Sequence, residues 1–322
     1  MQLEFLKINK NCKIESLEKN VMKNNRVAYV NGEIVPEVEA KVSYNDVGFL
    51  YGDAVFDTTR TFGGKIFRLQ QHLDRFFQSL KYMRIDPLMT QDEMSDITME
   101  VLERNLPLLG DNDDYWVSQR VSRGVRQDLG GLSNPTVVIE TFPLPLKQRA
   151  SLYKDGLQLV TPSVRRTPPV SQSPRAKVHN YINIVQADLE VKSQNPNASA
   201  LMLDINGNLC EGMGANLFLV KDGEIFTPHE QYILAGISRQ VTIDLANELG
   251  INVKEKNLDL YDAYTADEIF VTSTSYCICP VASVNGSKPD NQDVPGTVTK
   301  RLMDAYSGMV GIDIVGQYVA HL

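Results

Sequence analysis

The stretch LFLVKDGEIFTP, residues 217–228, places β-prone apolar runs on both sides of the dipeptide Asp222-Gly223. This dipeptide accepts the positive φ angles that a tight turn requires, so the stretch predicts a β-hairpin. Four more dipeptides of the same kind adjoin β-prone or apolar runs: Asn31-Gly32, Gly63-Gly64, Asn206-Gly207 and Asn285-Gly286. Together these turns favour sheets rich in antiparallel pairing over a doubly wound parallel sheet.

Apolar residues recur at helical spacing between the turns. The positions are Leu73, Phe76, Phe77, Leu80 and Met83; Ile182, Val185 and Leu189; and Val241, Leu245 and Leu249. In the last segment, SRQVTIDLANELG, we expect Ser238 to be the N-cap and Gly250 the stop signal. Helices interspersed with antiparallel sheets give the fold class α+β.

The length of 322 residues and a hydrophobic content of 43% predict two domains. The segment TFPLPLKQRA, residues 141–150, contains Pro143 and Pro145, which break regular structure. We therefore place the boundary near residue 146. The expected organisation is an N-terminal extension (1–26), a small domain (27–146) and a larger domain (147–322).

Composition excludes several classes of partner. A net charge of −8 argues against nucleic-acid binding. The four cysteines lack zinc-site spacing, which favours a reduced, cytoplasmic protein without a metal. No apolar run is long enough for a membrane span, and charges interrupt the N-terminal segment that a signal peptide would occupy.

Lys177 and Glu211 are candidate reagents, although each has an ordinary alternative. Lys177, in PRAKVHNYIN, is either a surface lysine at a helix start or a lysine that forms a Schiff base with an aldehyde cofactor. Glu211, in LCEGMGANLFLV, is either a turn residue or a carboxylate that keeps a pyridine nitrogen protonated.

A phosphate site is the third candidate feature. Gly236, Ile237 and Ser238 lie at a predicted helix N-terminus, where free N–H groups favour an anion, although an ordinary capped helix has the same pattern. Thr274 and Ser275 can add hydroxyl donors. Arg75 is either a phosphate clamp or a charge at the rim. An amine, a carboxylate for a pyridine nitrogen and a phosphate site together indicate a pocket for pyridoxal 5′-phosphate.

Four ordered motifs carry a resemblance over residues 27–305. They are FLYGDAVFDTTRTFGGKIFRLQQHLDRFFQSL, LCEGMGANLFLVKDGEIFTP, ILAGISRQVTIDLANELGI and ADEIFVTSTSYCICPV. With these motifs the chain resembles the class IV, or fold type IV, pyridoxal-phosphate-dependent aminotransferases, and within them the branched-chain enzymes. The resemblance implies a small N-terminal α/β domain, a larger C-terminal domain with a barrel-like sheet, and a homodimer whose active sites take residues from both subunits.

The resemblance also implies roles for the residues at matching positions. Lys177 is implied to carry the cofactor and Glu211 to pair with its ring nitrogen. The implied phosphate ligands are Arg75, Gly236, Ile237, Ser238, Thr274 and Ser275. Tyr181 stands where some members place an aromatic residue near the phenolic oxygen of the cofactor. It follows Lys177 by four residues, whereas typical branched-chain members place the tyrosine after five.

The implied reaction is transfer of an amino group between an apolar, branched-chain-like amino acid and a 2-oxo acid such as 2-oxoglutarate. Two alternatives stay open: a D-amino acid or (R)-selective amine transaminase, and an aminodeoxychorismate lyase. Arg60 and Arg126 are candidates for binding the substrate carboxylate, and a structural ion pair is the alternative for each. Tyr51 and Phe56 can line a side-chain pocket or pack a core.

Overall fold

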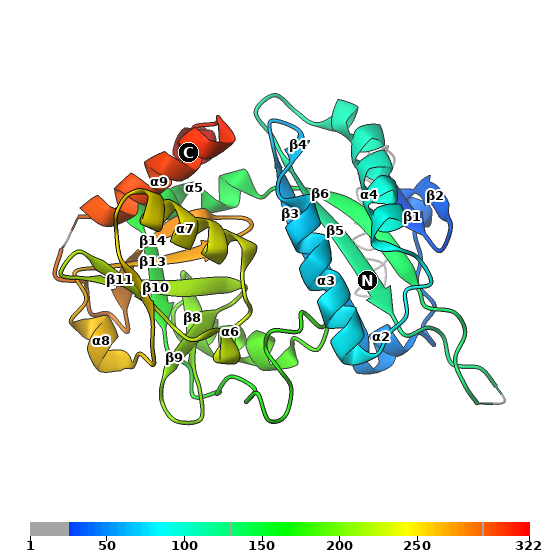
Figure 1. The fold of residues 1–322 in the computed structure, drawn as a ribbon, viewed down its shortest axis with the longest axis horizontal. Helices are drawn as coiled ribbons and strands as arrows, with labels where there is room; N and C mark the ends of the chain where they lie inside the picture. Colours follow the sequence, from blue (N-terminus) through cyan, green and yellow to red (C-terminus); the bar gives the residue numbers. More distant parts are fainter. Residues whose placement is uncertain (1–25, 129, 292) are drawn as a thin grey trace, which may run out of the picture.

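The computed structural model describes residues 26–128, 130–291 and 293–322. Apart from Arg26, the predicted N-terminal extension lies outside the described residues. Two sheets stand side by side (Figure 1), the first built from the N-terminal part of the chain and the second from the C-terminal part. Within the described residues no helix is long and apolar enough to cross a membrane.

The first sheet has six strands in the order β2-β1-β6-β5-β3-β4, and all neighbouring pairs are antiparallel. Two of its hairpins turn at the predicted dipeptides Asn31-Gly32 and Gly63-Gly64, whose residues all have positive φ. The strands are β1 (Val27–Val30), β2 (Glu33–Pro36), β3 (Ala54–Phe62), β4 (Lys65–Ile66), β5 (Tyr115–Ser122) and β6 (Val137–Pro143).

Helices α3 and α4 cover one face of this sheet (Figure 1). The predicted apolar positions Leu73, Phe76 and Leu80 of α3 are buried against it, which confirms that helix. α4 starts at a capping box formed by Thr90 and Glu93. The helical segments of this part are η1 (Glu37–Glu39), α2 (Val47–Tyr51), α3 (Leu69–Met83), α4 (Gln91–Asn105) and η2 (Leu106–Leu108).

The second sheet closes on itself. Its order is β12-β11-β10-β13-β14-β7-β8-β9, and β9 also pairs with β10, so the strands from β10 to β9 form a six-membered ring. This ring confirms the barrel-like sheet and the α+β class. The strands are β7 (Leu157–Val160), β8 (Ala198–Leu203), β9 (Leu209–Gly212), β10 (Ala215–Lys221), β11 (Glu224–Thr227), β12 (Val253–Glu255), β13 (Glu268–Ser273) and β14 (Cys277–Val284).

The hairpin predicted over residues 217–228 joins β10 to β11. Asp222 and Gly223 take φ values of 52° and 77°, and Leu219 pairs with Phe226 across the antiparallel ladder. The local turn chemistry therefore determines this pairing, as expected for a two-residue loop.

The helices that flank the barrel are α5 (Leu146–Asp155), α6 (Ile182–Gln194), η3 (Glu230–Tyr232), α7 (Ile237–Glu248), α8 (Leu260–Tyr264), α9 (Thr297–Val310) and α10 (Ile314–Val319). The helix predicted from Ile182, Val185 and Leu189 is present as α6. Its buried side is another stripe, however: Ile182 and Leu189 are exposed, and Ile184, Ala187 and Val191 pack on β8. Both stripes are apolar at helical spacing, so periodicity alone does not choose between them.

The start of α7 also differs from the prediction. Gly236 occupies the N-cap position, and no side chain of the described residues caps the helix. Ser238 lies inside the first turn instead. Gly250, at φ 72°, follows the helix as the predicted stop.

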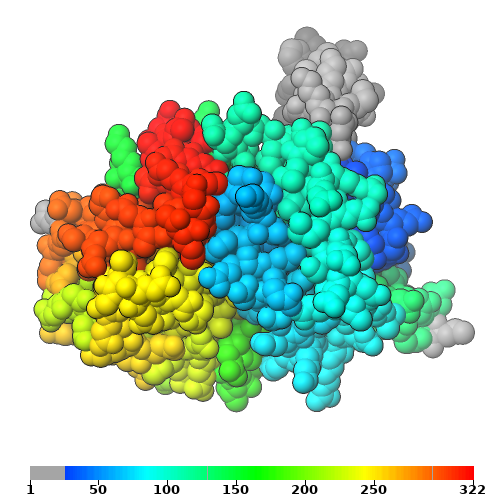
Figure 2. All heavy atoms as spheres, turned by 45° about the horizontal axis from the view of Figure 1, so that its top comes forward, coloured from blue at the N-terminus to red at the C-terminus, as the bar shows by residue number. Residues whose placement is uncertain are grey.

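The chain passes from the first sheet to the second between Pro143 and Leu157. The division into domains at residue 146 stays a prediction. The C-terminal helix α10 returns to the first part of the chain, where Gln317 donates to the backbone carbonyl of Asn112 at 2.9 Å and to Asp114 at 2.8 Å. Figure 2 shows the red C-terminal helices packed against the blue β3–β4 hairpin.

Candidate active site

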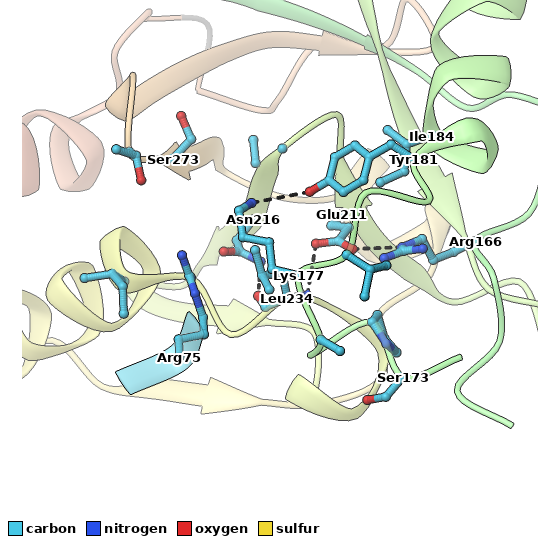
Figure 3. Close-up of a pocket in the computed structure, with 18 of the residues that line it drawn as sticks. Arg75, Arg166, Ser173, Lys177, Tyr181, Ile184, Glu211, Asn216, Leu234 and Ser273 are labelled. Atoms are coloured by element: carbon cyan, nitrogen blue, oxygen red, sulfur yellow. Dashed lines mark hydrogen bonds and ion pairs between the residues drawn. The ribbon is translucent and has the colours of Figure 1, made fainter. Parts of the chain in front are cut away.

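A cavity, called the first cavity below, lies where the two parts of the chain meet (Figure 3). Its walls come from α3, the loop 166–181, the β9–β10 hairpin, the start of α7 and the end of β13. Lys177, Glu211 and Arg75 all line it, although they are far apart in the sequence. The fold therefore brings together the amine, the carboxylate and the guanidinium that were singled out separately as candidates.

Lys177 is half-buried in the cavity wall and is not a surface lysine. Its backbone is fixed from both sides, since its N–H donates to the Ser79 hydroxyl at 3.1 Å and its carbonyl accepts from Phe56 N at 3.0 Å. Its Nζ lies 3.3 Å from the Tyr181 hydroxyl and 4.6 Å from the centre of the Phe56 ring. The four-residue spacing thus still brings the tyrosine hydroxyl to the amine.

Glu211 lies in strand β9, is almost fully buried and holds two fixed contacts. Oε1 accepts from Arg166 Nε at 2.8 Å, and Oε2 accepts from the backbone N–H of Leu234 at 3.0 Å (Figure 3). The two donors therefore hold both oxygens of the carboxylate in place. This role of Arg166 could not be predicted from the sequence, since the partners are 45 positions apart and leave no local signal.

The opposite end of the cavity suits an anion. The uncapped N-terminus of α7 presents Gly236, Ile237 and Ser238 to it. The Thr272 hydroxyl lines the same wall, is buried, and has no hydrogen-bond partner among the described residues. An oxyanion at this end would satisfy that hydroxyl and the free helix N–H groups. Thr272 was missed by sequence analysis, although it lies inside the FVTSTS segment.

Arg75 is held in place by a buried network. Its Nε and Nη2 donate to Asp57 at 2.8 and 2.7 Å, and its Nη1 donates to the Ala235 carbonyl at 2.9 Å, just before α7. His72 Nδ1 contacts the same carboxylate at 2.8 Å. Burial alone would raise the pKa of Asp57, but the Arg75 and His72 charges and hydrogen bonds hold it well below the usual range.

We expect Asp57→Asn to lower the free energy of unfolding at pH 7 by about 3–5 kcal/mol, because it removes one partner of a buried ion pair. Since the folded-state pKa is lowered, the stabilisation is complete above the unfolded value of about 3.9 and is lost as the pH falls below it. Urea unfolding of both proteins between pH 3 and 7 should therefore show a difference that shrinks towards pH 3. Asp304→Asn, at an exposed ion pair, is the control. A difference independent of pH would contradict this account.

Gly236 leaves room for Asn216. A Cβ at residue 236 would collide with Oδ1 of Asn216, whose Nδ2 donates to the Leu234 carbonyl at 2.9 Å. We expect Gly236→Ala to displace the start of α7, because the added methyl group overpacks this site at a cost of about 1–3 kcal/mol. The affinity for pyridoxal phosphate should therefore fall by about 10–100-fold. Titration of the protein with pyridoxal phosphate measures this. Gly308→Ala, on an open helix surface, should bind normally, and equal affinities of the two variants would refute the role of Gly236.

Thr274 and Ser275 were both predicted to bind the phosphate through their hydroxyl groups, but only Thr274 lines the first cavity. Thr274 lines the first cavity and donates to the Thr58 carbonyl at 3.2 Å. Ser275 does not line the first cavity; it faces a second cavity on the other side of Lys177, and its buried hydroxyl has no partner among the described residues. The predicted contact of Ser275 with the cofactor is therefore not supported, because the chain turns away after Thr274.

The residues that were predicted to bind the substrate lie in different parts of the structure. Phe56 packs edge-on against Tyr181, with ring centres 5.3 Å apart, beside Lys177. Tyr51 is exposed, and its hydroxyl accepts from Arg126 at 3.3 Å, away from both cavities. Within one chain, then, neither Tyr51 nor Arg126 reaches the site.

Arg60 does not suit its predicted role as a carboxylate clamp. It is 1% exposed and lines neither cavity. Its guanidinium instead donates to Gln317 at 3.0 Å and to the Ser275 carbonyl at 3.3 Å, so it ties β3 to the C-terminal part of the chain. The prediction was wrong because an arginine in a strand looks the same in sequence whether it faces a pocket or a packed interface.

Solved structures share this architecture. The branched-chain amino acid aminotransferase of Escherichia coli matches with a TM-score of 0.80 and 30% identity, over 89% of this chain and 95% of that one. A branched-chain amino acid aminotransferase of T.th., complexed with N-(5′-phosphopyridoxyl)-L-glutamate, matches with a TM-score of 0.78 and 26% identity, over 89% and 95%. The fold and the lysine cavity together define a fold type IV enzyme.

Sequence comparison gives the family. The model of the family described as amino-transferase class IV matches residues 54–284. A putative branched-chain-amino-acid aminotransferase of Methanocaldococcus jannaschii is 40% identical over 283 residues, which cover 86% of this chain and 94% of that protein. The chain belongs to the class IV aminotransferases, and it is an enzyme of that class.

Proposed function

We propose that the protein is a pyridoxal-phosphate-dependent transaminase that moves an amino group between an apolar, branched-chain-like amino acid and a 2-oxo acid such as 2-oxoglutarate. The observation that carries the proposal is the position of Lys177 Nζ in a cavity with a fixed carboxylate at one end and an uncapped helix N-terminus at the other. The names of the relatives support the substrate class.

The residues of the first cavity fit pyridoxal phosphate. Arg75, Ile237, Ser238 and Thr272 would hold its phosphate, and Glu211 would face its ring nitrogen. When bound, the cofactor would supply an aldehyde that accepts the amino group of the substrate and an electron-poor ring that delocalises the electrons left at the α-carbon.

Lys177 would hold the cofactor and then act as the base. Its Nζ is the atom that removes the proton from the substrate α-carbon. The Tyr181 hydroxyl, which accepts from Nζ at 3.3 Å, orients the amine. Phe56 shields the same amine from water on one side, because its ring lies 4.6 Å away. The ion pair with Arg166 would hold the buried Glu211 carboxylate in position for the ring nitrogen.

We further propose the homodimer and the cytoplasmic location that the sequence predicts. Exposed aromatic side chains around α2 support the dimer, since a patch of this kind typically marks a protein interface: Tyr44, Phe49 and Tyr51 are 76%, 74% and 66% exposed. In such a dimer Tyr51 and Arg126 would serve the site of the second subunit.

The test is a panel of single half-reactions, each monitored through the absorbance of the bound cofactor. L-leucine and L-valine should convert the bound cofactor to its amine form, and 2-oxoglutarate should restore it. D-alanine, (R)-1-phenylethylamine and aminodeoxychorismate should react at least about 100-fold more slowly, because the site is built for one substrate geometry. Exclusive reaction with the D-amino acid or the amine, or release of pyruvate from aminodeoxychorismate, would refute the proposed substrate class.

A further inference from the structure

The second cavity, of about 480 Å³, opens on the other side of Lys177. Its walls come from β3, β5 and β6 of the first sheet and from residues of the barrel around Gly214 and Thr274. Lys177, Gly214, Ser273 and Thr274 line both cavities, so the two are continuous at the lysine. A substrate whose α-carbon lies at Lys177 Nζ can therefore extend its side chain into the second cavity.

The second cavity contains a cation that forms no ion pair with the residues the structure describes. Its charged side chains are Arg120, Glu140, Arg149 and Lys177. Arg120 Nε donates to Glu140 at 2.9 Å, so these two charges offset each other. Arg149 forms no ion pair within the described part of the chain, and its buried Nη1 lacks a hydrogen-bond partner there. The guanidinium therefore adds an uncompensated positive charge to the cavity wall, which a bound anion would offset.

Aromatic side chains hold the Arg149 guanidinium in place. Its Cζ lies 5.0 Å from the ring centre of Trp116 and 4.6 Å from that of Tyr276. Trp116 belongs to β5 of the first sheet, and Tyr276 precedes β14 of the barrel. Cation–π attraction fixes the charge between the two parts of the chain without neutralising it. A guanidinium held in this way can still offer its N–H edge to a carboxylate.

On the basis of the proposed function, we propose that Arg149 binds the distal carboxylate of the dicarboxylic substrate, a 2-oxo dicarboxylate or its amino acid. Arg149, Trp116 and Tyr276 line the second cavity alone. They therefore suit the far end of a substrate better than its α-carboxylate, which is one bond from the reacting carbon. The apolar partner substrate has no distal carboxylate and meets Trp116 and Phe142 in the same space.

Three other arginines, Arg60, Arg123 and Arg126, are already engaged or lie outside both cavities. Arg123 donates to both oxygens of Asp53 and to two backbone carbonyls. Arg60 is buried in the interface with α10, and Arg126 lies on the surface beside Tyr51. Arg149 escaped sequence analysis because it follows the predicted domain boundary and belongs to none of the motifs.

The experiment compares Arg149→Gln with the wild-type holoenzyme in separate half-reactions with L-glutamate and L-leucine. We expect kcat/KM for L-glutamate to fall by about 10–100-fold, the value of a charged hydrogen bond, while that for L-leucine changes less than about twofold. Arg149→Lys should recover part of the loss. Calorimetry should show the same selective loss for glutarate and not for 4-methylpentanoate, neither of which reacts. Arg104→Gln, at an exposed ion pair, is the matched control.

Several outcomes would overturn the assignment. Equal losses for both amino acids would make Arg149 an α-carboxylate ligand or a structural residue. Loss of glutamate activity in Arg120→Gln but not in Arg149→Gln would transfer the role to Arg120. Failure of the wild-type enzyme to use L-glutamate would refute the assignment, whereas failure with L-leucine alone would refute only the apolar substrate of the proposed function.

Discussion

Lys177→Ala is expected to reduce transamination between L-leucine and 2-oxoglutarate by at least about 10³-fold, within the range that a positioned acid–base group contributes. The variant loses both the amine that would hold the cofactor and the base that would move the α-proton. Tyr181 and Phe56 cannot replace it, since neither offers an amine at that point of the cavity. Steady-state kinetics with saturating pyridoxal phosphate measures the loss.

The variant should remain folded. The backbone contacts of residue 177 to Ser79 and Phe56 do not involve its side chain, so alanine preserves them. Its melting temperature should lie close to that of the wild type. Lys147→Ala, at an exposed position of α5, is the control and should retain full activity. A Lys177→Ala enzyme with a tenth of the wild-type rate would show that another group acts as the base.

Glu211→Gln is expected to lower kcat by about 10²–10³-fold, the usual effect of removing a fixed charge that stabilises a transition state. The amide can still accept from Leu234 N–H through its oxygen. Its NH₂ group, however, would then face the Arg166 donor, and no negative charge would face the cofactor ring. Because the phosphate end is untouched, affinity for pyridoxal phosphate should change by less than about tenfold.

Single-turnover rates together with cofactor titration separate the two effects. Glu211→Asp, which keeps the charge on a shorter side chain, should recover part of the rate. Glu224→Gln, at a surface ion pair with Lys254, should behave like the wild type. A loss of cofactor affinity with an unchanged rate would assign Glu211 a structural role instead.

Much of the fold could be predicted from local sequence, because turn and helix signals act over a few residues. Asp222-Gly223 determines a hairpin through two backbone angles, wherever the hairpin lies in the molecule. The buried face of α6 could not be predicted, since two apolar stripes compete and only contact with β8 decides between them. The closure of the barrel, through β9 and β10, was expected only from the resemblance.

The residues of the candidate site also fall into those that the sequence could predict and those that it could not. Lys177, Glu211 and the start of α7 stand out through residue type and neighbouring glycines, and the structure brings them to one cavity. Arg166 and Arg149 carry no such signal. Arg166 matters through Glu211, which is distant in sequence, and Arg149 through a charge that no ion pair of the described residues offsets. Arg60 is the opposite case. Its residue type suggested that it binds a carboxylate, but its buried position makes it a contact between β3 and the C-terminal part of the chain.

The central claim is that Lys177 holds the cofactor, and one measurement addresses it directly. The purified protein is mixed with pyridoxal phosphate, reduced with borohydride, digested and mapped by mass spectrometry. The account predicts one stoichiometric phosphopyridoxyl label, on the peptide that contains Lys177, and prior addition of L-leucine should prevent it. A label on another lysine, or no stoichiometric label, would contradict the account.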